Sequence, residues 1–194
     1  MAEPANGGEI YGAVPLAHHF LRVKVCPGDR VVDATCGNGN DTLLLARLVG
    51  PRGKVYAFDL QAEAIGTTRE LLAGEDLAGR VELVWAGHEQ LGERIREPLR
   101  AAVFNLGYLP GGDKELVTRP GTTVAALDAA LHLLLPGGLL LVVVYTGHAG
   151  ASDEEAAVLA WGAGLEPRSC NVWSSRQLNR SAAAPYLVLV EKRS

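Results

Sequence analysis

The chain has 194 residues, of which 48% are hydrophobic, 21% charged and 6% aromatic, a composition typical of one globular domain rather than of a disordered chain. The 18 basic and 22 acidic residues give a net charge of -4, which does not indicate a general nucleic-acid-binding protein. The three cysteines form no CxxC pair, so we expect no disulfide framework, no metal site and a reducing, cytoplasmic location.

The predicted elements begin after a loose leader at residues 1–12, which carries acids and lacks the apolar segment of a signal peptide. An apolar leader helix ending at His18-His19 follows, and short β-branched runs then alternate with segments of helical period. Strands are predicted at 30–34, 54–59, 81–86, 101–105 and 139–145, and helices at 41–49, 62–72, 120–134 and 153–163.

Two further strands are predicted at 167–173 and 186–191, with no helical pattern between them. The repeated alternation predicts a doubly wound, Rossmann-like α/β sheet that is mostly parallel, and the helix-free joint predicts an antiparallel last strand. The longest apolar run is far below the ~20 residues that a membrane span needs. We therefore expect a single domain over 1–194 and no membrane partner.

A glycine-rich turn follows the first predicted strand. In doubly wound sheets, ligands lie beyond the carboxyl ends of the strands. Gly37 and Gly39 allow a tight turn and a close approach of the backbone to a ligand. Asp59 lies twenty residues past Gly39, at the end of the next strand, where a carboxylate can accept both hydrogen bonds of a ribose diol. This spacing predicts a cofactor that contains a nucleoside.

The charge of this turn distinguishes between two cofactors. A dinucleotide site favours a third Gly or Ala where this chain has Thr42, and its pyrophosphate would be repelled by Asp33 and Asp41. The same carboxylates would attract the ammonium and sulfonium groups of S-adenosylmethionine. We therefore expect S-adenosylmethionine as cofactor and S-adenosylhomocysteine as product, with an NAD-dependent oxidoreductase as the less favoured alternative.

With these features the sequence resembles the class I S-adenosylmethionine-dependent methyltransferases. More narrowly, it resembles MnmM, a small bacterial family first labelled as rRNA methylases and now associated with tRNA wobble-uridine methylation. The motifs that carry the resemblance are Leu16-Ala17-His18, Asp33 to Thr42, Tyr56 to Gln61, Asn105 to Lys114, Tyr145 to His148, and Asn179 with Ala184-Pro185. The resemblance implies cofactor contacts by Asn38, Asn40, Asp41, Asp59, Gln61, Gly87 and His88. It also implies that the enzyme converts the 5-aminomethyl group of a wobble 2-thiouridine to 5-methylaminomethyl.

The candidate catalytic residues follow the fourth strand. An amide oxygen of Asn105 can accept an N–H bond from the target nitrogen, and the Tyr108 ring can pack against the base. Only the neutral amine carries the lone pair for attack, so the site has to favour that form. Asp113 either takes the proton or stabilises the ammonium, and its sequence position allows both roles.

Contacts to the anticodon region of tRNA are expected from several polar residues. Residues 164–194 carry five bases and two acids, which indicates either a local basic patch or ordinary surface charge. The expected substrate contacts are Lys114, Arg119, His148, Arg176, Asn179 and Arg180. Trp173 is expected to pack in the core rather than to stack on a base, and a homodimer is possible.

Other residues have simpler explanations. Adjacent histidines on a helix diverge by about 100°, so His18 and His19 are expected to cap the helix or to pack on the substrate side rather than to bind a metal. The acids at 153–155 lie in a first helical turn, where they complement the helix dipole. Cys36 has no neighbouring base and is not expected to act as a nucleophile. For function, an rRNA or small-molecule amine remains an alternative acceptor, and a nucleotide-binding module without turnover is the alternative outside enzymes.

Overall fold

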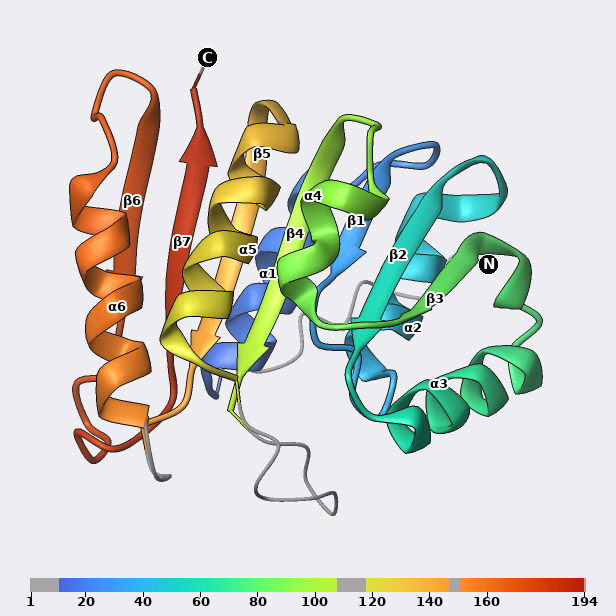
Figure 1. Ribbon diagram of the computed structural model, residues 1–194, viewed down its shortest axis with the longest axis horizontal. Coiled ribbons are helices and arrows are strands. Elements are labelled where there is room, and N and C mark those ends of the chain that lie inside the picture. The colour runs from blue at the N-terminus through green and yellow to red at the C-terminus, as the bar shows by residue number, and fades with distance from the viewer. Residues whose placement is uncertain (1–10, 108–117, 147–150, 194) are drawn as a thin grey trace.

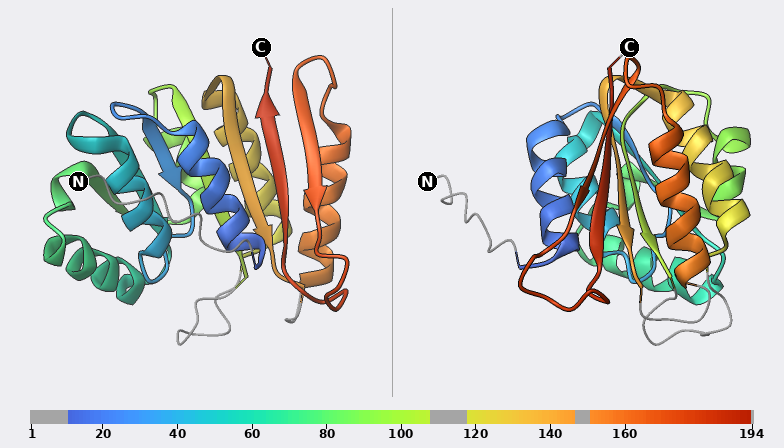
Figure 2. Two further views of the ribbon diagram at one scale, coloured as in Figure 1. Left: turned by 180° about the vertical axis from the view of Figure 1, so that it is seen from behind. Right: turned by 90° about the vertical axis from the view of Figure 1, so that its left-hand side faces the viewer.

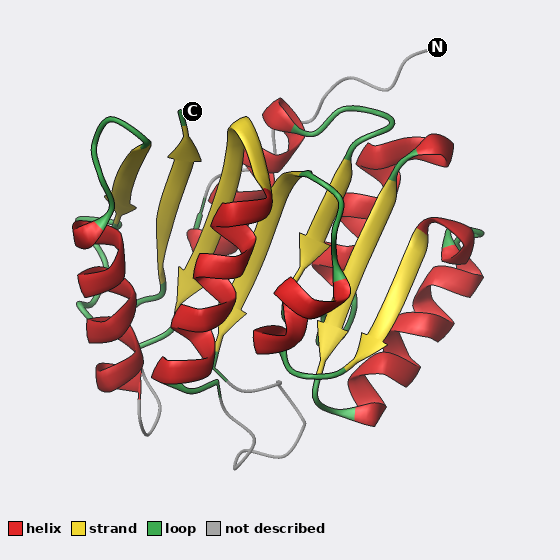
Figure 3. Cartoon of the chain, turned by 45° about the horizontal axis from the view of Figure 1, so that its top comes forward, coloured by secondary structure: helices red, strands yellow, loops and turns green. Residues whose placement is uncertain are grey.

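The computed structural model describes residues 11–107, 118–146 and 151–193. Within these ranges, seven strands form one sheet in the order β3-β2-β1-β4-β5-β7-β6, with helices on both faces (Figures 1 and 3). The strands are β1 (Arg30–Asp33), β2 (Lys54–Asp59), β3 (Val81–Trp85), β4 (Leu99–Leu106), β5 (Leu134–Val144), β6 (Cys170–Ser175) and β7 (Tyr186–Lys192). The helices are α1 (Ala13–Lys24), α2 (Asn40–Val49), α3 (Ala62–Gly74), α4 (Leu91–Arg94), α5 (Pro120–Leu133) and α6 (Ala151–Gly164).

The direction of the strands confirms the predicted fold class. Strands β1 to β5 run parallel to one another, whereas β7 runs antiparallel to both β5 and β6. The last strand thus lies between β5 and β6 instead of at the edge of the sheet. The carboxyl ends of the parallel strands lie along one edge, the lower edge in Figure 1.

The core consists of two apolar layers, one on each face of the sheet. Side chains alternate along β4, so that Phe104 packs in the layer under α5 and Val103 in the layer under α1 and α2. The two helical layers are seen on either side of the sheet in Figure 2. The unbroken apolar run of β5 follows from this arrangement, because a central parallel strand is buried on both faces.

The largest differences from the predicted strands are the starts of β5 and β6. Strand β5 begins at Leu134, because Pro136-Gly137-Gly138 forms an irregularity inside the strand instead of ending it. A Cβ at Gly138 would lie 2.8 Å from the Leu135 carbonyl oxygen, so this close approach favours glycine. Strand β6 begins later than predicted, at Cys170, because the carbonyl of Glu166 accepts the N–H groups of both Ser169 and Cys170 and closes a turn.

The helices also differ from the prediction in two places. Helix α1 continues to Lys24, so His18 lies in its middle rather than at its end. The four-residue helix α4 was not predicted, because a segment this short has no readable helical period. No helix in the described part of the chain has the length and apolarity that crossing a bilayer requires.

Candidate active site

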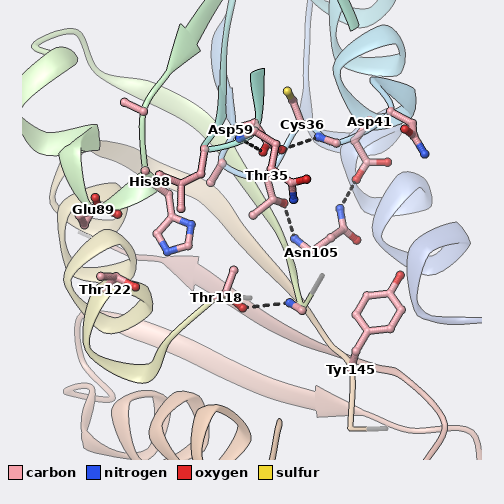
Figure 4. Close-up of a pocket in the computed structure, with 18 of the residues that line it drawn as sticks. Thr35, Cys36, Asp41, Asp59, His88, Glu89, Asn105, Thr118, Thr122 and Tyr145 are labelled. Atoms are coloured by element: carbon pink, nitrogen blue, oxygen red, sulfur yellow. Dashed lines mark hydrogen bonds between the residues drawn. The ribbon is translucent and has the colours of Figure 1, made fainter. Parts of the chain in front are cut away.

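A cavity of about 450 Å³ opens at the carboxyl ends of β1, β2, β3 and β4 (Figure 4). This is the edge at which ligands bind in doubly wound sheets. The predicted site residues among its lining are Gly37, Asn38, Asn40, Asp41, Asp59, Gln61, Gly87, His88, Asn105 and Arg119. The remaining lining residues are Val14, Ala34, Thr35, Cys36, Leu60, Ala86, Glu89, Gly107, Thr118, Thr122 and Tyr145.

The turn after β1 is held by the acid at the end of β2. Gly37 adopts a positive φ of 51° and donates its backbone N–H to Asp59 Oδ2 at 2.9 Å. The other oxygen of Asp59 accepts the backbone N–H of Gln61 at 2.9 Å. Each carboxylate oxygen can accept a second hydrogen bond, so Asp59 can still receive hydroxyl groups from a ligand.

Two residues that were predicted to contact the cofactor, Asp33 and Gly39, do not line the cavity. Gly39 begins α2 with a φ of 83°, and a Cβ there would lie 3.0 Å from Thr68 Oγ1 on α3. Asp33 is fully buried and accepts hydrogen bonds from the Thr42 hydroxyl at 2.6 Å and from the Thr35 backbone. Neither residue lines the cavity: Gly39 is part of the turn itself, and Asp33 holds the turn through Thr35 and Thr42.

The burial of Asp33 changes the predicted charge of the site. Burial and the neighbouring charge of Asp41 raise the pKa of Asp33 to about 7. Asp33 is therefore largely protonated in mildly acidic solution. The carboxylates that do line the cavity belong to Asp41, Asp59 and Glu89. The acidic character that the sequence predicted is retained, but it comes in part from different residues.

Asn105 and Asp41 meet at the other end of the cavity. The side-chain nitrogen of Asn105 donates to Asp41 Oδ2 at 2.7 Å, and its backbone N–H donates to Thr35 Oγ1 at 2.8 Å. The second oxygen of Asp41 lies 2.6 Å from Nε2 of His18 on α1. Tyr145 closes this end of the site, with its hydroxyl pointing toward the same side (Figure 4). Burial, together with the charge of Asp41, raises the pKa of Tyr145 above its ordinary value.

Three buried polar atoms have no hydrogen-bond partner among the described residues: Gln61 Oε1, His88 Nε2 and Asn105 Oδ1. All three belong to residues that line the cavity. Buried polar atoms are nearly always satisfied in folded proteins, so these atoms fit the polar groups of a ligand. Burial also lowers the pKa of His88, which favours a neutral imidazole at this place.

The remaining predicted substrate and catalytic residues do not all meet at the cavity. Tyr108, Asp113, Lys114 and His148 lie outside the described residues. Arg176, Asn179 and Arg180 are exposed, follow β6 and do not line the cavity. The Arg176 guanidinium lies 3.4 Å from the centre of the Tyr186 ring and donates to Glu155 at 2.6 Å.

The prediction that Trp173 packs in the core is wrong. Its side chain is 50% exposed, because β6 is an edge strand and this ring lies on an uncovered surface. Cys36, by contrast, is buried, and burial raises the pKa of its thiol well above the ordinary range, which agrees with the prediction that it is not a nucleophile.

A buried acid links the end of β4 to two helices. Glu154 on α6 is 2% exposed and accepts hydrogen bonds from the hydroxyls of Thr118 and Thr123, each at 2.6 Å. The Thr118 hydroxyl also accepts the backbone N–H of Gly107 at 2.9 Å. Glu154 was predicted only as an acid that complements the helix dipole. Its sequence context gave no signal for this buried role.

Several lining residues were not predicted as site residues. Tyr145 could have been found, since it directly follows β5 at the edge where the other strands contribute ligand contacts. Thr118 and Thr122 carry no such signal, because they lie just before α5 and in its first turn and reach the cavity only through the way this helix packs.

Together, the sheet order, the carboxylate-bonded glycine turn and the cavity at the strand ends define a class I methyltransferase. The family model described as "Putative rRNA methylase" matches residues 55–191. The chain belongs to this family.

Similar proteins cover nearly the whole chain. A protein of Arabidopsis thaliana named tRNA (mnm(5)s(2)U34)-methyltransferase, chloroplastic, is 42% identical over 96% of this chain and 72% of its own length. A crystal structure from Clostridium thermocellum, described as a "putative rRNA-methylase", has a TM-score of 0.92 and 41% identity over 95% of this chain and 100% of that chain. A "putative methyltransferase" from Streptococcus mutans in complex with SAH has a TM-score of 0.86 and 38% identity over 95% of this chain and 99% of that chain.

Proposed function

We propose that the protein binds S-adenosylmethionine in this cavity and transfers its methyl group to the 5-aminomethyl group of a wobble uridine or 2-thiouridine in tRNA. The product would be the 5-methylaminomethyl nucleoside. The observation that carries the proposal is the unpaired oxygen of Asn105, buried beside Asp41 in the same cavity as Asp59. The name of the Arabidopsis relative supports the choice of acceptor.

The residues on the β2 side fit the nucleoside part of this cofactor. Asp59 presents carboxylate oxygens to the cavity, and Gln61 and His88 each present an unpaired polar atom. When bound, the cofactor supplies an electrophilic methyl group on a positively charged sulfur. The carboxylate of Asp41 near the Asn105 end favours that positive charge. The SAH complex of the Streptococcus mutans relative supports this assignment.

The residues on the β4 side fit an amine as the group that receives the methyl. Asn105 Oδ1 can accept one N–H of the amine and thereby orient its lone pair. Desolvation in the cavity, whose lining includes the apolar Val14 and Ala34, would lower the pKa of a bound ammonium and favour the neutral, reactive form. Tyr108, predicted to pack against the base, and Asp113, predicted either to take the proton or to stabilise the ammonium, remain part of this proposal.

The tRNA itself would approach the edge of the sheet at which the cavity opens. The exposed Arg119 lies at this edge and can reach a phosphate, and the loops that carry Lys114 and His148 are predicted at the same edge. We propose that Arg176, Asn179 and Arg180 extend the contact along the exposed connection between β6 and β7. Exposed basic side chains of this kind bind the backbone and make the affinity depend on salt.

We also propose a cytoplasmic location, which the free cysteines Cys26, Cys36 and Cys170 support, since thiols persist in reducing compartments. The Arabidopsis relative is named as chloroplastic, so location differs within the similar proteins. The possible homodimer stays a prediction, which analytical ultracentrifugation tests. The exposed Trp173 on the edge strand β6 is a candidate contact between the two copies.

The test of the proposed function is methylation of defined RNA by the purified protein. Transfer RNA from a strain that lacks this methylation would be incubated with S-adenosylmethionine, and its nucleosides analysed by mass spectrometry. We expect 5-aminomethyl-2-thiouridine to convert to the methylaminomethyl form. Matched tRNA without the aminomethyl group and purified rRNA serve as controls. Methylation of rRNA with no conversion of the tRNA nucleoside would overturn the proposed acceptor and favour the alternative.

A further inference from the structure

We propose that Asp41 and His18 are positioning residues that orient the Asn105 side-chain amide so that its oxygen, and not its nitrogen, faces the methyl acceptor. This inference rests on the proposed function, because it concerns how the acceptor amine is held. It assigns a positioning role to His18 on helix α1, which was expected to cap the helix or to pack on the substrate side.

The orientation of the amide follows from the chemistry of its partner. The carboxylate of Asp41 can only accept hydrogen bonds, and it lies 2.7 Å from the side-chain nitrogen of Asn105. The reversed amide would place Asn105 Oδ1 against a carboxylate oxygen, two acceptors that repel each other. The amide therefore donates to Asp41, and its oxygen is left as the buried, unpaired acceptor of the cavity.

His18 holds Asp41 in the position that this arrangement needs. Its Nε2 lies 2.6 Å from Asp41 Oδ1, so the two oxygens of one carboxylate contact two different side chains. Asp41 is only 7% exposed, which leaves its carboxylate little contact with water. His18 comes from the middle of α1, between the buried Ala17 and Leu21. The packing of α1 on the sheet thus fixes the direction from which the imidazole reaches Asp41.

The proposed role predicts an effect on turnover without a matching effect on cofactor binding. With His18 removed, the Asp41 carboxylate can rotate, and the Asn105 amide is free to present N–H groups to the acceptor. An amine then loses the oxygen that orients its lone pair, and misplacement of reacting groups by small distances lowers rates strongly. The residues on the β2 side, including Asp59, keep their contacts.

The principal experiment compares His18→Leu with His18→Gln. Leucine has similar bulk and no donor, whereas the glutamine amide can donate from about the position of Nε2. We expect His18→Leu to lower kcat for tRNA methylation about tenfold or more, while its Kd for S-adenosylhomocysteine stays within about twofold of the wild-type value. His18→Gln should keep most of the wild-type kcat. The exposed neighbour His19 supplies the matched control, His19→Leu, which we expect to behave as the wild type.

Two outcomes would overturn the inference. One is wild-type turnover in His18→Leu, and the other is a loss in His18→Gln as large as in His18→Leu. If His18→Leu does not fold, His18→Gln and His18→Asn replace it, because both are polar but asparagine is too short to reach Asp41. Equal turnover of these two variants would then contradict the role of His18.

A double-mutant cycle separates this inference from the proposed function. If His18 acts through Asn105, His18→Leu adds almost nothing in an Asn105→Ala background, whereas independent effects would multiply. Full turnover by Asn105→Ala alone would contradict the proposed acceptor site. If Asn105→Ala loses turnover and His18→Leu keeps it, only the inference about His18 is contradicted.

A second measurement needs no substrate. The side-chain NH₂ resonances of Asn105 can be assigned by their absence from the ¹⁵N NMR spectrum of Asn105→Ala. We expect slow solvent exchange of the hydrogen-bonded proton in the wild type and His18→Gln, and faster exchange in His18→Leu. Identical exchange in all three proteins would show that His18 does not hold this contact, whatever the RNA substrate is.

Discussion

The backbone N–H of Gly37 donates to the carboxylate of Asp59 at 2.9 Å, although the two residues are 22 positions apart. The acid at the end of β2 therefore shapes the turn after β1 as well as facing the cavity. The glycine pattern and the distant acid, which are two separate motifs in the sequence, form one unit in the structure.

The first prediction follows from this double role. Asp59→Ala removes the acceptor for Gly37 and Gln61 together with the proposed contact to the ribose hydroxyls. We expect the Kd for S-adenosylhomocysteine to rise about ten- to a hundredfold, because hydrogen bonds to a charged group contribute roughly 1.5–3 kcal/mol. Isothermal titration calorimetry measures this, with the exposed Glu63→Ala on α3 as control. Tight binding of NADH by the wild type, with none of the homocysteine, would contradict the cofactor assignment.

The second prediction concerns Asn105. Asn105→Ala removes the unpaired acceptor at the end of the cavity but leaves Asp59, Gln61 and His88 in place. We expect kcat to fall about a hundredfold, since this group orients the reacting amine, while cofactor affinity changes little. Single-turnover methylation and calorimetry distinguish the two quantities. A large loss of cofactor affinity without a loss of turnover at saturating cofactor would place Asn105 at the cofactor instead.

The third prediction is a pH dependence of stability. The pKa of Asp33 is raised to about 7 in the folded protein, so folding becomes less favourable as the pH rises from about 4, the unfolded value, to about 7. The variant Asp33→Asn has no such titration, and the amide that it introduces can accept from the Thr35 backbone and donate to the Thr42 hydroxyl.

We therefore expect the free energy of unfolding of Asp33→Asn to increase relative to the wild type by on the order of 1–3 kcal/mol between pH 5 and pH 8. Urea denaturation of both proteins at several pH values measures this difference in the free energy of unfolding. The contributions of the other titrating groups largely cancel, because both proteins contain them. A constant difference across this range would show that Asp33 is ionised throughout.

The fourth prediction concerns the buried acid of α6. Glu154→Leu leaves the hydroxyls of Thr118 and Thr123 without their acceptor, and Thr123 is fully buried. We expect the free energy of unfolding to fall by about 1–3 kcal/mol, the cost of unsatisfied buried polar groups. Glu154→Gln keeps one acceptor oxygen, so its free energy of unfolding should fall less. Chemical denaturation compares the two, and equal losses would mean that the hydrogen bonds are not the cause.

The sheet and its cofactor edge could be predicted from the sequence because their signals are local. The Leu and Val run of β5 indicates a strand buried on both faces, and the spacing from Gly39 to Asp59 spans one helix and the strand that follows it. The antiparallel direction of β7 could also be predicted, because a short helix-free joint cannot return the chain for a parallel strand.

The contacts between distant elements could not be predicted in this way. The pairing of His18 with Asp41 and the burial of Glu154 depend on how helices pack against each other, and hydrophobic period gives the face of a helix but not its partner. Trp173 was misplaced for a related reason. An aromatic residue in a strand looks the same whether that strand is central or at an edge, and only the sheet order separates the two cases.

Because β7 lies between β5 and β6, the sheet is completed only when the last of the described strands is in place. Strand β6 leaves the ribosome before β7, the only neighbour with which it pairs among the described strands. Until residues 186–192 are in place, β6 and its half-exposed Trp173 lack the strand with which they pair. Premature termination before β7 would leave the flank of β5 uncovered, so released chains truncated at this point should be sensitive to proteolysis.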